Sequence, residues 1–133
     1  MEVSQTWKNL TWLLLRLSAA FVFIWFAVGK LFLGAVPPVD TIITFWPADV
    51  SLFLLGMTEA VVGILLVFGL FTRFAGAVAS LLYLTFIVSG IYLGLFDTAF
   101  LTKDIGLFGA TLALMIFGAH SYSIDGWLAK KKK

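Results

Sequence analysis

Four long apolar segments alternate with short polar connections along the chain. They read from about Trp12 to Leu33, Ser51 to Phe71, Phe74 to Phe96 and Asp104 to Ala119. A helix of about 20 residues crosses a hydrocarbon core of roughly 30 Å, and no segment shows the polar alternate face of a membrane β-barrel strand. The pattern therefore predicts an all-α integral membrane protein, with a four-helix antiparallel bundle forming a single domain over residues 1–133.

The connections between these segments differ in length. The longest, Val36 to Val50, is amphipathic enough to lie at the membrane interface between the first two helices. Thr72-Arg73 is predicted to be a tight turn, which makes the second and third helices antiparallel neighbours. Small residues favour close approach of membrane helices, so the packing stripe predicted for the fourth helix is Gly106, Ala110, Ala113, Phe117 and His120. His120, at the end of this stripe, is expected to be a polar anchor at the interface, with proton exchange as a lesser alternative.

Basic residues near the ends of the segments predict the orientation in the membrane. Lys8, Arg73 and the tail Lys130 to Lys133 fall on one side, whereas Lys30 and Lys103 fall on the other among four aspartates. Lysine and arginine are enriched on the cytoplasmic side of membrane proteins. We therefore expect both termini in the cytoplasm and a multi-pass protein of the plasma membrane.

The composition supports a lipid environment and excludes several kinds of chemistry. Hydrophobic residues make up 62% of the chain and charged residues 12%, which is too little polar cover for a water-soluble domain. The chain has no cysteine and only one histidine, His120. We therefore expect no disulfide, no thiol nucleophile and no metal site built from several histidines. We also expect no covalently bound cofactor. The net charge of +2 depends on the lysine tail, so nucleic acid is not an expected partner.

Charged residues inside the predicted spans are the main candidates for a site. Arg16 and Lys30 share one face of the first helix, and Glu59 lies well inside the second. An unpaired charge at that depth costs about 2.5–3.5 kcal/mol, so we expect Glu59 to pair with Arg16 or Lys30. Two interpretations stay open: a structural ion pair that fixes helix register, or a polar pocket that binds a head group or relays protons.

Two further polar residues are candidates for the same interior. Tyr83 lies on the small-residue stripe of the third segment, which places its hydroxyl on a packing face. Thr102 before Asp104 is typical of a helix N-cap with an acid in the first turn. Lys30, Glu59 and Asp104 are all predicted in the same half of the bundle, where they could line one polar cavity. No residue is assigned a catalytic role.

These positions resemble a known family. Leu15-Arg16-Leu17, Phe23 to Phe26, Gly29-Lys30-Leu31-Phe32, Gly56, Glu59, Gly63 and Gly69 to Arg73 are similar to the pattern of the DoxX family, and Lys103-Asp104 with Gly109 fits its last span more loosely. The resemblance implies a four-helix prokaryotic membrane protein related to the DoxD subunit of thiosulfate:quinone oxidoreductases, with redox partners. Arg16, Lys30, Glu59 and Arg73 match its charged positions.

Two functions remain in competition at this point. The first is a membrane subunit of a quinone-linked oxidoreductase complex, whose charged interior binds a quinone head group or handles its protons. The second is a noncatalytic accessory subunit that stabilises a larger membrane complex. Solute transport is disfavoured because the chain shows no inverted repeat and no helix broken at mid-membrane. In either case we expect membrane lipid and other membrane protein subunits as partners.

Overall fold

The computed structural model of the chain is all-helical, as predicted. It describes residues 4–35, 47–95, 99–119 and 122–131. The helices are α1 (Gln5–Phe32), α2 (Ala48–Phe68), α3 (Thr72–Tyr92), α4 (Ala99–Phe117) and α5 (Ile124–Lys131). Among the described residues, α1, α2 and α3 are long and apolar enough to cross a membrane.

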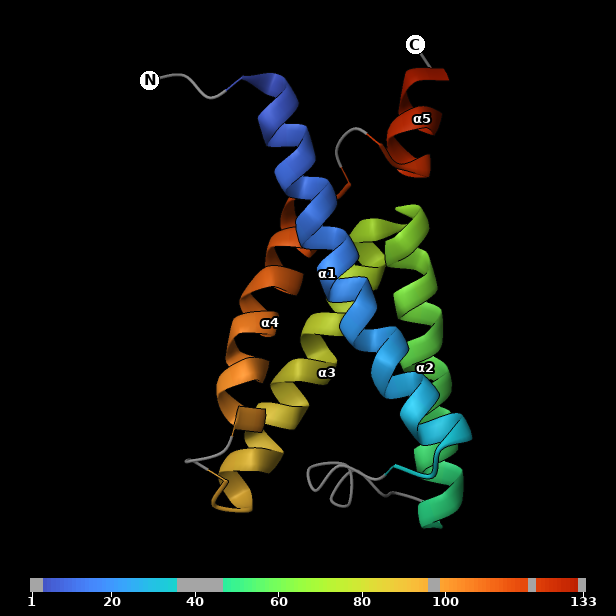
Figure 1. Cartoon of the computed structure of the whole chain (residues 1–133), viewed down its shortest axis with the longest axis vertical. Coiled ribbons are helices and arrows are strands. Elements are labelled where there is room, and N and C mark those ends of the chain that lie inside the picture. Colours follow the sequence, from blue (N-terminus) through green and yellow to red (C-terminus); the bar gives the residue numbers. More distant parts are fainter. Residues whose placement is uncertain (1–3, 36–46, 96–98, 120–121, 132–133) are drawn as a thin grey trace.

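The four long helices lie alongside one another, and the chain reverses direction between them (Figure 1). α1 packs mainly on α2 and α3 mainly on α4, while α2 with α3 and α1 with α4 make fewer contacts. We call the end where α1 begins, with the α2–α3 turn and α5, the termini end. The end where α1 and α3 finish is the opposite end.

Glycines permit the closest helix contacts. At Gly63 of α2, an added Cβ would lie 2.7 Å from the Ile24 Cγ1 atom and 3.2 Å from its main-chain nitrogen. At Gly76 of α3, it would lie 2.6 Å from the main-chain nitrogen of Met115 in α4. Both helix pairs therefore need a position without a side chain where they meet, as is usual for helices packed in lipid.

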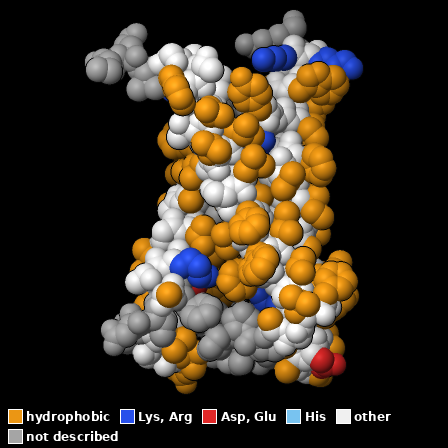
Figure 2. All heavy atoms as spheres, in the orientation of Figure 1, with side chains coloured by type: hydrophobic (Ala, Val, Ile, Leu, Met, Phe, Trp, Pro, Cys, Tyr) orange, Lys and Arg blue, Asp and Glu red, His pale blue; other side chains and the backbone are white. Residues whose placement is uncertain are grey.

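The outer surface of the bundle is apolar. Large side chains such as Phe21, Trp25 and Phe74 are 64%, 66% and 65% exposed, and hydrophobic side chains cover much of the face seen in Figure 2. Exposed apolar area of this extent marks a contact surface. It is the surface expected of helices that face lipid.

Two predicted boundaries differ from the structure, the start of the first helix and the turn between the second and third helices. α1 begins at Gln5 rather than near Trp12, because Ser4 caps it by accepting a hydrogen bond from the Trp7 amide at 3.5 Å. Thr72-Arg73 is not the turn but the start of α3. The turn lies at Gly69 to Phe71, where Gly69 has φ +62° and Phe71 has φ +49°. Left-handed residues of this kind end a helix abruptly.

The fourth segment also differs from its prediction. α4 begins at Ala99, so Thr102 is inside the helix and donates to the Ala99 carbonyl at 3.3 Å instead of capping. The predicted small-residue stripe is wrong as well: Gly106 and Phe117 are exposed. The buried positions of α4 include Leu101, Asp104, Thr111 and Leu114.

The predicted interfacial segment, Val36 to Val50, falls mostly on residues 36–46, which lie outside the described residues. Its last residues, 48–50, form the first turn of α2.

Candidate functional site

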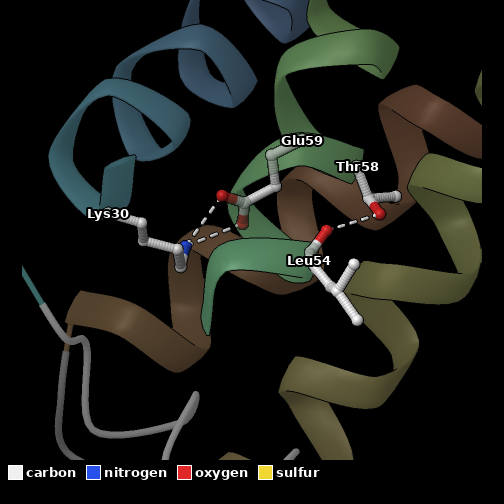
Figure 3. Close-up of polar contacts among 4 residues, drawn as sticks. All are labelled: Lys30, Leu54, Thr58 and Glu59. Atoms are coloured by element: carbon white, nitrogen blue, oxygen red, sulfur yellow. Dashed lines mark hydrogen bonds and ion pairs between the residues drawn. The ribbon is translucent and has the colours of Figure 1, made fainter. Parts of the chain in front are cut away.

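A buried ion pair joins α1 to α2 near the opposite end. Lys30 Nζ donates to both carboxylate oxygens of Glu59 at 2.8 Å, and the two side chains are each 2% exposed. Figure 3 shows the two side chains pointing toward one another, while the neighbouring Thr58 bonds back to the Leu54 carbonyl of its own helix. Lys30 is therefore the basic partner that the depth of Glu59 requires.

α1 can approach α2 closely at this ion pair because α2 has a glycine beside it. Gly56 lies one turn before Glu59, and a Cβ there would be 3.0 Å from the Leu31 Cγ atom and 3.3 Å from the Lys30 Cβ atom. The last turn of α1 thus lies directly against α2. Lys30 is in that last turn, where a positive charge also complements the helix dipole.

A second ion pair lies close to the first, on α4. Lys103 Nζ is 2.7 Å from the Asp104 Oδ1 atom, with the lysine side chain 35% exposed and the aspartate side chain 3% exposed. Both lysines lie near the Phe26 ring of α1, whose centroid is 5.2 Å from Lys30 Nζ and 4.5 Å from Lys103 Nζ. Cations near an aromatic face are attracted to it, so one ring connects the two pairs.

Tyr83 of α3 completes the group from the inside of the bundle. It is 2% exposed, and its ring packs on Phe23 at 5.1 Å and on Phe86 at 6.1 Å between centroids. Glu59 and Asp104 are both near enough to act electrostatically on the tyrosine hydroxyl. All four long helices therefore contribute a polar side chain to one region, which we call the charged cluster: Lys30, Glu59, Tyr83, Lys103 and Asp104.

A recess of about 300 Å³ borders the charged cluster on the side of α1 and α2. Lys30 lines it together with Asp49, Leu52 and Phe53. Ligand sites typically combine apolar walls with a few polar groups, in volumes of roughly 300–1,000 Å³. The recess is thus at the lower limit for a small ring-shaped ligand, with Lys30 as its basic group.

The side chains of the cluster supply both hydrogen-bond donors and proton carriers. Lys30 and Lys103 are ammonium donors, Tyr83 is a hydroxyl donor, and Glu59 and Asp104 are carboxylates. Of these side chains, Lys30 lines the recess, and its ammonium is bonded to Glu59.

Arg16, predicted beside these residues, lies elsewhere. It is buried at the termini end, where its Nη2 atom donates to the Tyr122 carbonyl at 2.7 Å and its Nη1 atom is close to Gly69. Gly69 follows Glu59 by ten residues, which is roughly 15 Å along a helix. Arg16 is thus too far from Glu59 to pair with it.

Asp125 of α5 joins Arg16 in this second group. Its carboxylate accepts hydrogen bonds from the amides of Phe71 at 2.9 Å and Thr72 at 2.8 Å, and its own amide donates to the Gly69 carbonyl at 3.0 Å. Asp125 therefore caps the start of α3 from a different helix. We call Arg16, Asp125 and the main-chain groups they bind the terminal lock.

Sequence reasoning missed Phe26, Lys103 and Asp125 as parts of these two groups. Lys103 and Phe26 are on different helices, and only the packing of α1 near α4 brings them into contact. For Asp125 the sequence does contain a signal, because the serine two residues before it, Ser123, is a residue type that begins helices. In the structure Ser123 accepts a hydrogen bond from the Gly126 amide at 3.0 Å, as a helix N-cap does. His120, predicted as a polar anchor with a lesser role in proton exchange, lies outside the described residues.

Comparison with family models identifies a known family. The family described as TQO small subunit DoxD matches residues 39–133, which include Glu59, Tyr83 and Asp104 but not the Lys30 and Phe26 positions of α1. The search of curated proteins and the search of solved structures gave no match.

Proposed function

The chain belongs to the DoxD family, and on that premise we propose that it is a membrane subunit of a quinone-linked oxidoreductase complex whose charged cluster binds a quinone head group or handles its protons. The observation that supports this most is the Lys30–Glu59 pair, buried at 2% exposure on both sides and held at 2.8 Å. Charges inside a membrane are costly, and they tend to mark ligand or proton pathways.

In this proposal the side chains have separate tasks. Lys30, which borders the recess, donates a hydrogen bond to a carbonyl oxygen of the ligand. Glu59, held against Lys30, takes up or gives a proton at its carboxylate, and Tyr83 with Asp104 extends the set of proton carriers toward α4. Electrons come from a partner subunit, because the chain has no cysteine and only one histidine to hold a redox metal.

The membrane arrangement proposed with this function has four spans, formed by α1 to α4, in a prokaryotic plasma membrane with both termini cytoplasmic. Because the chain has no cysteine, single cysteines at positions 73 and 103 report sidedness cleanly. We expect an impermeant thiol reagent to label position 103 from outside the cell and position 73 only after permeabilisation. Labelling of both from the same side would contradict the arrangement.

A noncatalytic accessory role is the second candidate. The observation in its favour is that Lys30 already bonds to both oxygens of Glu59, so the pair can fix the register of α1 against α2 without a ligand. In this case the chain contributes helix surface to a larger complex and no chemistry.

The substitution Glu59→Gln separates the two candidates, because it keeps the shape of the side chain and removes its charge. The proposal predicts that the complex assembles and that quinone-dependent turnover falls by about tenfold or more. Thr58→Val is the matched control, since Thr58 is exposed and bonds only to its own helix, and it should leave turnover unchanged. Full turnover of an assembled Glu59→Gln complex would refute the proposal and support the accessory role.

A further inference from the structure

A second recess, of about 440 Å³, lies at the termini end between the start of α3 and the end of α4. Arg73, Thr72 and Gly118 line it, together with exposed phenylalanines. It is far from the charged cluster, and the proposed function makes no use of it.

Two polar groups of this recess have no protein partner among the described residues. The Arg73 guanidinium makes no hydrogen bond or salt bridge there, and the Thr72 hydroxyl is fully buried without a hydrogen-bond partner. Asp125 also borders the recess, where its carboxylate accepts hydrogen bonds from the amides of Phe71 and Thr72 and acts electrostatically on Arg16. The recess therefore presents an exposed arginine that has no salt bridge among the described residues, with one carboxylate on the same lining.

The Arg73 side chain lies against the end of α4. Gly118 has φ +72°, and a Cβ at this position would lie 3.2 Å from both the Cγ and the Nε atoms of Arg73. The stem of Arg73 thus lies across a backbone position that only glycine leaves open, while the residue as a whole is exposed. The planar set of guanidinium donors suits the oxygens of a phosphate.

The rim of the recess is apolar and aromatic. Phe71 and Phe74 are each 65% exposed and Phe117 is 56% exposed. In a helix bundle that crosses a membrane, the turn between α2 and α3 lies at the level of the lipid head groups, and apolar side chains beside it face acyl chains. One unpaired arginine with an apolar rim matches a molecule with one phosphate and two hydrocarbon chains.

We propose that this recess binds a phospholipid, with the phosphate on Arg73 and the acyl chains along Phe74 and Phe117. The phosphate could also be free in solution, so the test separates the two sources. The full chain in a neutral detergent is titrated with phosphatidylglycerol, with diacylglycerol of the same acyl chains, or with inorganic phosphate, and binding is measured by native mass spectrometry.

The expected result is that phosphatidylglycerol binds the wild-type chain at least about tenfold more tightly than diacylglycerol does, and that Arg73→Gln removes this difference, as loss of a charge-assisted hydrogen bond implies. Lys131→Gln is the matched control, because Lys131 is a basic residue of the same end that lies over the Trp127 ring, away from the recess. It should bind within about twofold of wild type. Unchanged binding by Arg73→Gln, equal binding of diacylglycerol, or displacement of the lipid by inorganic phosphate would each overturn the proposal.

Discussion

At the termini end, Arg16 and Asp125 bind main-chain groups, whereas at the opposite end charged side chains face one another. Arg16 donates to the Tyr122 carbonyl, and Asp125 accepts from the amides of Phe71 and Thr72. In the charged cluster, Lys30 bonds to Glu59 and Lys103 to Asp104.

This difference separates two uses of charge. A charge that satisfies main-chain groups fixes the path of the chain, and changing it rearranges a turn or a helix end. A charge that faces another side chain can exchange its partner for a ligand or a proton while the backbone stays in place. We therefore assign the terminal lock to architecture and propose chemistry only for the charged cluster.

The largest effect is expected from breaking the buried pair on one side only. Lys30→Met leaves Glu59 buried without its ammonium partner, which should lower the free energy of unfolding by about 3–5 kcal/mol. The double variant Lys30→Met, Glu59→Leu should recover most of this loss, because apolar replacement of a whole buried pair is often neutral. Unfolding in detergent measures both. A double variant no more stable than the single one would show that the pair is not the source of the loss.

A smaller effect is expected at the terminal lock. Asp125→Asn removes the charge and one of the two acceptor oxygens that cap α3, which should cost about 1–3 kcal/mol. Asp49→Asn is the matched control, since Asp49 is an exposed acid in the first turn of α2. Hydrogen exchange of the first amides of α3 should accelerate in Asp125→Asn alone. Equal exchange in both variants would remove the distinction between the two ends.

The smallest effect concerns the ring shared by the two lysines. Phe26→Leu keeps an apolar side chain and removes the aromatic face, which should cost about 0.5–2 kcal/mol. Phe21→Leu serves as the control because Phe21 is 64% exposed and has a different partner, Trp25. If the two variants lose equal stability, Phe26 acts by apolar packing and does not link the ion pairs.

Several features could be predicted from the sequence because they follow from the cost of burying charge in lipid. That cost required a basic partner for Glu59, and helical spacing placed Lys30 on the inner face of α1. The same spacing placed Tyr83 on the inner face of α3. The functional roles of Lys30, Glu59 and Tyr83 stay predictions.

Other features depend on contacts that no local pattern reveals. Arg16 was expected within reach of Glu59, but the antiparallel packing of α1 on α2 places Lys30 against Glu59 and Arg16 against Gly69, at the other end of α2. In α4, small residues were expected to face inward, but Asp104 and Thr111 are among the buried positions, and Thr111 accepts a hydrogen bond from the Ser80 hydroxyl of α3 at 3.1 Å. Polar side chains need partners inside a bundle, so their demand outweighed the preference for small residues. α5 is short, and Asp125 rather than a long apolar face attaches it to the bundle. The spacing of its apolar residues therefore did not indicate a helix.

The most direct test of the charged cluster is photolabelling of the intact complex with a benzoquinone that carries a diazirine. We expect crosslinks on the peptides that contain Lys30 and Glu59, and we expect excess unmodified quinone to remove them and Glu59→Gln to weaken them. Crosslinks confined to the end with Arg16 and Asp125, or none that excess quinone displaces, would contradict it.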